Sequence, residues 1–89
     1  MIEREIAITN KLGLHARASA KLVQTMSGFR SRAKLCAKGR EVDAKSIMGV
    51  MMLAAGQGSK VVMRTDGEDE AEAMTAAVDL FARKFDEGD

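Results

Sequence analysis

Apolar and polar residues alternate in four short stretches of the chain. In residues 2–8, isoleucines at positions 2, 6 and 8 alternate with polar side chains. Arg4 is the one exception, a charged residue at a position where the alternation calls for an apolar one. Residues 32–37, 41–44 and 60–65 form three similar stretches. A period of two is typical of half-buried β-strands. The pattern predicts four strands, with Lys38-Gly39 as the turn of a hairpin between the second and third.

In the segments between these strands, the spacing of the apolar residues predicts helices. From residue 16 onward, Ala18, Leu22, Met26 and Phe29 fall on one helical face, and Ser27-Gly28 ends the pattern. A second helix is predicted to begin near residue 46 and to end at the Gly-Gln-Gly of residues 56–58.

Asp66-Gly67 leads into a third predicted helix. Its apolar stripe comprises Ala71, Met74, Val78, Phe81 and Phe85. Acidic residues gather in its first turns and basic residues near its end, which matches the helix dipole.

The predicted order is therefore β-α-β-β-α-β-α. Short alternating strands favour a four-stranded antiparallel sheet, covered on one face by the three helices, with Lys and Glu on its open face. We expect an α+β open-faced sandwich that forms a single domain over residues 1–89.

Composition narrows the class of protein. The chain has 14 basic and 13 acidic residues, and three phenylalanines are its only aromatic residues, which argues against nucleic-acid binding. The lone Cys36 cannot form an intrachain disulfide, which fits a reducing compartment. Because no apolar run reaches membrane-spanning length and the first residues do not resemble a signal peptide, we expect a cytoplasmic protein without membrane insertion.

The only histidine, His15, lies where a loop over residues 10–14 gives way to a helix. If the helix begins at Ala16, His15 takes the N-cap position without the usual Ser, Thr, Asp or Asn side chain. We therefore expect the amides of Ala16 and Arg17 to be available to an anion. The Arg17 guanidinium matches phosphate oxygens, and Gly13 lets the backbone bend so that the ring projects toward solvent. A neutral imidazole is a competent nucleophile, so a phosphohistidine at His15 is feasible.

Other interpretations of His15 remain open at this point. A lone histidine near a loop is often a surface residue or forms a hydrogen bond in a turn. Metal ligation is disfavoured, because the sequence has no second histidine and Cys36 has no obvious partner. No motif places an acid or a nucleophile for a Ser-His hydrolase. We expect no metal and no cofactor.

Residues 47–55 contain no polar side chain. A helix that is apolar all round should be buried all round, but one helix layer on one sheet cannot bury both sides. We expect one exposed face, formed by Ile47, Met48 and Met51, and methionine suits a surface that packs against several partners. The alternative is an ordinary buried core helix.

Ser46 stands directly before this apolar run, where its hydroxyl oxygen is placed to cap the helix. A capping role of Ser46 does not exclude that its hydroxyl is also phosphorylated to regulate the protein. Phosphorylation would add about two negative charges at the helix start and would alter the adjacent apolar face.

Three segments together carry a family resemblance. Gly13-Leu14-His15-Ala16-Arg17, Lys45-Ser46-Ile47-Met48-Gly49 and Gly56-Gln57-Gly58-Ser59 closely resemble HPr, the histidine-containing phosphocarrier family of the bacterial phosphoenolpyruvate-dependent sugar phosphotransferase system. The resemblance covers essentially the whole chain and implies the same β-α-β-β-α-β-α fold.

The resemblance implies a role for each site residue. His15 would accept a phosphoryl group at Nδ1 from phosphorylated enzyme I and pass it to a IIA protein or domain, with Arg17 steadying the group. The face of Ile47, Met48 and Met51 would dock both partners. Ser46 would match the site modified by HPr kinase/phosphorylase in bacteria that have that enzyme. The protein would be a carrier rather than an enzyme. An exposed docking patch on a small carrier favours a monomer that meets its partners briefly.

Two departures from the family pattern bear on these expectations. Ala18 stands where the family usually has proline, which affects only the rigidity of the turn. Lys11-Leu12 stands where many sugar-branch members have a polar residue or proline, which leaves a nitrogen-related regulatory branch open. A protein-binding adapter that is not phosphorylated is the alternative from another class.

Overall fold

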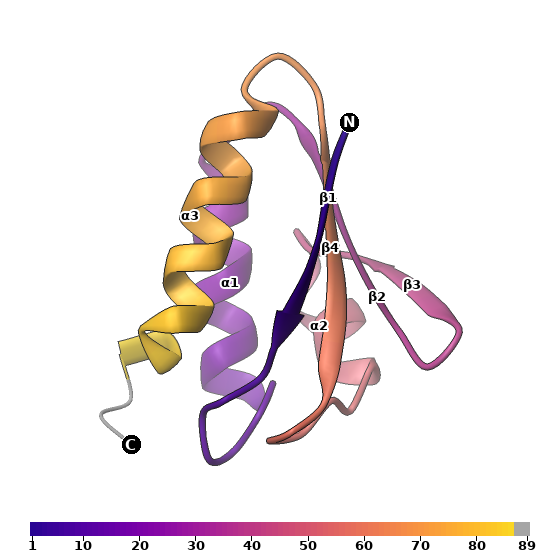
Figure 1. The fold of residues 1–89 in the computed structure, drawn as a ribbon, viewed down its shortest axis with the longest axis vertical. Coiled ribbons are helices and arrows are strands. Elements are labelled where there is room, and N and C mark those ends of the chain that lie inside the picture. Colours follow the sequence, from indigo (N-terminus) through magenta and orange to yellow (C-terminus); the bar gives the residue numbers. More distant parts are fainter. Residues whose placement is uncertain (87–89) are drawn as a thin grey trace.

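The computed structural model describes residues 1–86, which form a four-stranded sheet and a layer of helices (Figure 1). The elements in chain order are β1 (Ile2–Ala7), α1 (Ala16–Ser27), β2 (Arg32–Ala37), β3 (Arg40–Asp43), α2 (Ile47–Met52), β4 (Lys60–Asp66), α3 (Glu70–Ala82) and the 3₁₀ helix η1 (Lys84–Asp86). The strand order is β1-β4-β2-β3 and every neighbouring pair is antiparallel. The predicted α+β open-faced sandwich is confirmed. Strand ends differ from the predicted ones by at most one residue.

The core lies between the sheet and the helices. Alternate residues of the strands face it, among them Ile6, Leu35 and Met63, and α1 contributes Leu22 and Met26. Removing these side chains from water is the main favourable term in the folding of a chain of this size.

The opposite face of the sheet carries charged side chains, as predicted. Arg64 on β4 pairs with Glu3 on β1 and with Glu41 on β3. One arginine thus links both edge strands of the sheet through their side chains.

The second helix is shorter than predicted. We expected it to reach residues 56–58, but α2 ends at Met52, and Ala54 has a left-handed φ of 50°. The chain leaves the helix because Leu53 and Ala55 turn into the core, where each is 3% exposed. An apolar run does not reveal such a turn, since helix and buried loop favour the same side chains here.

The predicted stripe of the third helix is partly wrong. Ala71 and Val78 are exposed. The buried residues of α3 are Ala73, Met74, Ala77, Leu80 and Phe81. Small apolar residues occur on several sides of this helix, so the pattern did not single out the buried side.

Phe85 lies beyond the third helix rather than within it. α3 ends at Ala82, and Phe85 has a φ of 56° in η1. Its ring nevertheless reaches the core and packs edge-on against Phe81, with 4.8 Å between the ring centroids and 66° between the planes. The prediction that Phe85 belongs to the apolar stripe of the helix is therefore wrong about the backbone, although its side chain is buried beside Phe81.

Candidate functional site

The loop between β1 and α1 is held by hydrogen bonds from buried polar groups. Asn10 Nδ2 donates to the Gly13 carbonyl at 2.8 Å, and the Leu14 N–H donates to the Ala55 carbonyl at 2.9 Å. Ser19 Oγ donates to the Leu14 carbonyl at 3.1 Å. Asn10 and Ser19 are both almost fully buried. This network fixes the backbone on both sides of His15.

Gly13 is required by both its conformation and its surroundings. Its φ is 63°, in the left-handed region. A Cβ at this position would lie 2.5 Å from the Ala55 carbonyl oxygen and 2.7 Å from the Gly56 Cα. The glycine therefore lets the loop before α1 contact the backbone that follows α2.

His15 is the N-cap of α1, and its own side chain makes the capping bond. Nδ1 accepts a hydrogen bond from the Arg17 N–H at 3.3 Å. The expectation that this helix start lacks a side-chain cap is therefore wrong. The physical reason is that a neutral imidazole has an unprotonated nitrogen, which accepts hydrogen bonds as a hydroxyl or carboxylate oxygen does.

This hydrogen bond bears on the chemistry of the ring. A nitrogen that accepts a hydrogen bond carries its lone pair, so the geometry assigns the proton of neutral His15 to Nε2. Nδ1 is then the nucleophilic atom, and it points at the first backbone amides of α1. The His15 ring is half-buried, and the Ala16 and Arg17 side chains that follow it are exposed. An incoming group would meet an electron pair beside the positive end of a helix dipole.

A cluster of exposed apolar side chains lies on α2. Ile47, Met48 and Met51 are 43%, 74% and 42% exposed, so this predicted face is exposed to solvent. Met52, which was not among the predicted residues, is 61% exposed and extends this face. These four residues are here called the α2 patch.

The α2 patch and His15 lie at neighbouring places in the fold. The segment after α2 packs on the loop before α1 through the Ala55 carbonyl, which accepts the Leu14 N–H. Figure 1 shows this segment and the start of α1 at the same end of the molecule, opposite the N-terminus. A protein that covers the patch thereby comes close to the imidazole.

Ser46 caps α2, as the sequence predicts. Its Oγ accepts a hydrogen bond from the Gly49 N–H at 3.1 Å. The neighbouring Lys45 Nζ donates to the Phe29 carbonyl at 2.8 Å and so ties the start of α2 to the end of α1. The Ser46 side chain is half-buried.

Sequence reasoning missed the residues that support the site. Asn10 and Ser19 carry no motif, and only their positions beside the glycine loop and one helical turn after His15 give any signal. The Ala55 carbonyl gives none, because a backbone group has no sequence signature.

Residues 1–86 bear on two further possibilities, a metal site and a membrane-spanning helix. In the described part of the chain, no three His, Cys, Asp or Glu side chains gather as they would around a metal ion. None of the helices within residues 1–86 has the length and apolar character needed to cross a bilayer.

Comparison with known proteins gives a consistent result. Residues 2–83 match the family model described as PTS HPr component phosphorylation site. The phosphocarrier protein HPr of Xylella fastidiosa is 63% identical over 87 residues, 98% of each chain, and that of Cupriavidus necator is 61% identical over the whole of both chains.

Solved structures agree with the sequence relatives. A crystal structure of HPr from Thermoanaerobacter tengcongensis superposes with a TM-score of 0.94 at 48% identity and covers 98% of each chain. The match of family model, relatives and fold extends over essentially the same residues. The chain belongs to the HPr family, the phosphocarrier proteins of the phosphotransferase system.

Proposed function

We propose that His15 carries the phosphoryl group and that Nδ1 is the atom to which it is bonded. The observation that supports this most directly is the hydrogen bond from the Arg17 N–H to Nδ1, which leaves the lone pair on that nitrogen. In the transfer, the Nδ1 lone pair attacks phosphorus, a nitrogen–phosphorus bond forms, and the donor atom of phosphorylated enzyme I departs with its electron pair. Nε2 keeps its proton, so the phosphorylated ring is a cation beside a phosphoryl dianion.

The first turn of α1 is suited to hold that dianion. The amides of Ala16 and Arg17 lie at the helix start, where no carbonyl of the same helix accepts them. The Arg17 side chain is exposed and only two residues after His15, so its guanidinium is available to the phosphoryl oxygens. These contacts are non-covalent, so the phosphoryl group remains easy to pass to a IIA protein or domain. The protein is a carrier and not a catalyst.

We propose that enzyme I and the IIA acceptor both dock on the α2 patch. The patch is apolar, largely exposed and beside the His15 loop, so one surface serves docking and transfer. Methionine side chains are flexible and fit differently shaped partners. We further propose that the protein works as a monomer in the cytoplasm, since two partners must use the same exposed face in turn.

One experiment tests both roles. The full chain is incubated with phosphoenolpyruvate and cognate enzyme I, and acid-labile phosphate is measured by mass spectrometry over time. We expect one phosphate per chain in the wild type and none in His15→Ala. Uptake by Met48→Glu should be at least tenfold slower. Because the Met48 side chain is 74% exposed, this substitution is not expected to impair folding. Val78→Glu is the matched control, since Val78 is 38% exposed on α3, outside both the α2 patch and the His15 loop. Uptake by His15→Ala at the normal rate would refute the proposal.

The acceptor is identified by the second half of the same assay. Phosphorylated protein is offered to a IIA domain of a sugar permease and, separately, to a regulatory IIA protein of the nitrogen-related type. The faster transfer assigns the branch to which this chain belongs.

We also propose that Ser46 is a regulatory phosphorylation site for an HPr kinase/phosphorylase. A phosphoryl group on Oγ would replace the acceptor of the Gly49 N–H and place two charges against the α2 patch. We expect Ser46→Asp to slow phosphoryl uptake from enzyme I by more than Ser46→Asn, because both cap α2 and only Asp is charged. Equal rates for the two variants, or no modification of wild-type protein by ATP and the kinase, would contradict the regulatory role.

A further inference from the structure

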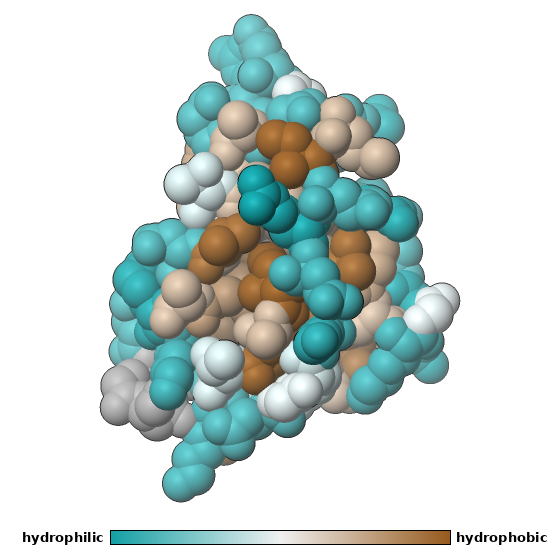
Figure 2. Space-filling view, viewed as in Figure 1, coloured by the Kyte–Doolittle hydropathy of each residue, from teal (hydrophilic) through white to brown (hydrophobic). Residues whose placement is uncertain are grey.

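A groove runs between β1 and α3. β1 lies at the edge of the sheet and pairs only with β4 within residues 1–86. The backbone N–H and C=O groups of alternate residues in such a strand point away from the sheet. Figure 2 shows apolar side chains around a hollow between β1 and α3. The hollow has a volume of about 520 Å³.

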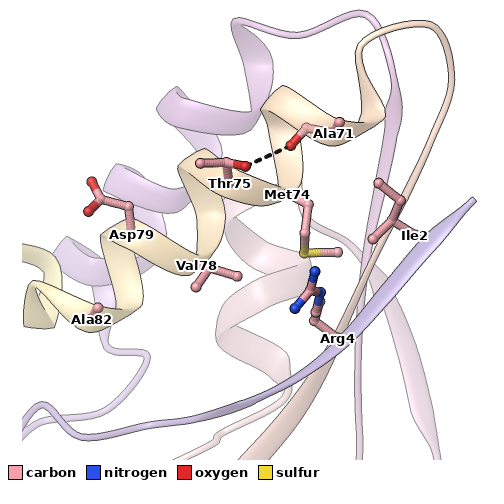
Figure 3. Close-up of a pocket in the computed structure, with 8 residues that line it drawn as sticks. All are labelled: Ile2, Arg4, Ala71, Met74, Thr75, Val78, Asp79 and Ala82. Atoms are coloured by element: carbon pink, nitrogen blue, oxygen red, sulfur yellow. Dashed lines mark hydrogen bonds between the residues drawn. The ribbon is translucent and has the colours of Figure 1, made fainter.

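α3 overhangs the free edge of β1 with a stripe of small side chains. Ala71, Thr75, Val78 and Ala82 line the groove at helical spacing (Figure 3). The Thr75 hydroxyl donates to the Ala71 carbonyl at 3.0 Å, so this donor is already paired within the helix. Val78 remains 38% exposed. The stripe has the composition of a surface that packs on another element. Within residues 1–86, β1 is the last strand on this side of the sheet, so nothing beyond it covers the outer part of the stripe.

Arg4 is the charged residue of this groove that lacks a partner. It occupies the core-facing phase of β1, between Ile2 and Ile6, and its guanidinium points toward Met74 on α3 (Figure 3). No carboxylate of residues 1–86 forms an ion pair with it. The acidic residue in the groove wall, Asp79, pairs with Arg83 at 2.9 Å. The exposed Arg4 therefore brings to a largely apolar groove, beside a free strand edge, a positive charge that no carboxylate of residues 1–86 pairs with.

We propose that this edge binds an extended segment of a partner protein as an additional strand. The segment would pair with β1 through backbone hydrogen bonds, place an acidic side chain opposite Arg4, and lay apolar side chains over the α3 stripe. Glu3 and Glu5 lie on the other face of β1, so basic residues are favoured on either side of the acidic one. The matching pattern is apolar-basic-acidic-basic-apolar.

A second copy of the chain does not fit this edge. Antiparallel pairing of two β1 strands centred on Arg4 puts Arg4 opposite Arg4 and Glu3 opposite Glu5. If one strand is shifted by two residues in either direction, Glu5 lies opposite Glu5 or Glu3 lies opposite Glu3. Like charges directly opposite each other are destabilising, so the complementary occupant is a different chain.

The test is an NMR titration of the full ¹⁵N-labelled protein with two capped peptides. Peptide one is Thr-Val-Lys-Glu-Lys-Val-Thr, and peptide two has its charges reversed, Thr-Val-Glu-Lys-Glu-Val-Thr. We expect saturable shifts for residues 2–7 and the α3 stripe with peptide one, at least tenfold weaker binding of peptide two, and slower amide exchange at alternate residues of β1.

A charge reversal in the protein makes the test specific. We expect Arg4→Glu to weaken peptide one at least tenfold and to bind peptide two better, while Arg32→Glu, on the interior strand β2, leaves the preference unchanged. Equal affinity for both peptides, shifts confined to the α2 patch, or binding of octanoate in the groove without peptide binding would overturn the proposal. Phosphoryl uptake by Arg4→Glu should stay normal, so this result is independent of the role of His15.

Discussion

His15 both caps its helix and provides the proposed phosphoryl acceptor, through the same nitrogen. Nδ1 accepts the Arg17 N–H in the unmodified protein. A phosphoryl group on Nδ1 removes that acceptor, but it brings oxygens to the same place. The Arg17 amide can therefore exchange one acceptor for a charged and stronger one. We therefore expect the helix start to need no rearrangement if Nδ1 is phosphorylated.

Two glycines with positive φ allow a matched comparison at the residue scale. Gly13 has a φ of 63° and a Cβ there would lie 2.5 Å from the Ala55 oxygen, whereas Gly39 has a φ of 77° and nothing within 4 Å of a Cβ. We expect Gly39→Ala to lower the free energy of unfolding by about 1 kcal/mol, the cost of a left-handed alanine. Gly13→Ala should cost more than about 2 kcal/mol, because the contact with the α2 segment is also lost.

Urea unfolding measures both losses, and phosphoryl uptake from enzyme I measures the consequence for the site. Uptake should be slowed in Gly13→Ala and unchanged in Gly39→Ala. An equal loss of stability in the two variants would show that the close approach of the two loops is unimportant.

At the scale of elements, Asp69 ties the start of α3 to the segment between α1 and β2. Its carboxylate accepts the N–H groups of Arg30 and Ser31, each at 2.9 Å, and the Ser31 hydroxyl. These bonds, led by that from the Ser31 hydroxyl, lower the pKa of Asp69 to about 2 from 3.8. The carboxylate thus accepts hydrogen bonds from the segment between α1 and β2 and does not cap its own helix.

This shift predicts a pH dependence of stability. Because the pKa of Asp69 is lower in the folded than in the unfolded protein, its contribution is fully present above pH 3.8 and is lost as the pH falls toward about 2. We expect Asp69→Asn to be less stable at neutral pH and to approach the wild type in melting temperature between pH 4 and pH 2. Glu68→Gln is the control, since the Glu68–Arg30 pair is highly exposed at 3.8 Å. A difference between wild type and Asp69→Asn that stays constant with pH would contradict this assignment.

For the molecule as a whole, a buried and an exposed leucine can be compared to measure how much core packing contributes to stability. Leu22 on α1 is 0% exposed and Leu12 in the His15 loop is 68% exposed. We expect Leu22→Ala to lower the free energy of unfolding by about 3 kcal/mol, through lost burial and a residual cavity. Leu12→Ala should change it by less than about 0.5 kcal/mol. Denaturant unfolding of both variants gives the comparison, and a similar change in both would show that Leu22 does not organise the core.

Strand periodicity and helix spacing were sufficient for the element order and the sheet, because alternation in β1, β2 and β4 reports directly which side faces the core. Helix ends were less predictable. α2 ends earlier than predicted and Phe85 lies outside α3. The reason is that a loop that faces the core requires apolar residues as much as a helix that faces the core, so an apolar pattern does not distinguish the two. The exposure of Ile47, Met48 and Met51 followed from the impossibility of burying both sides of one helix.

The sequence by itself determined the fold class, the single imidazole and its neighbouring arginine, and the resemblance to a phosphocarrier family. These depend on residue identity and short-range spacing, which a chain displays before it folds. Only the tertiary structure decided that Nδ1 caps α1, that Gly13 must admit the Ala55 carbonyl, and that Arg4 lies without a carboxylate partner among residues 1–86 in a groove beside a free strand edge. Each of these depends on backbone groups or on residues far apart in sequence, and their meeting is set by packing rather than by pattern.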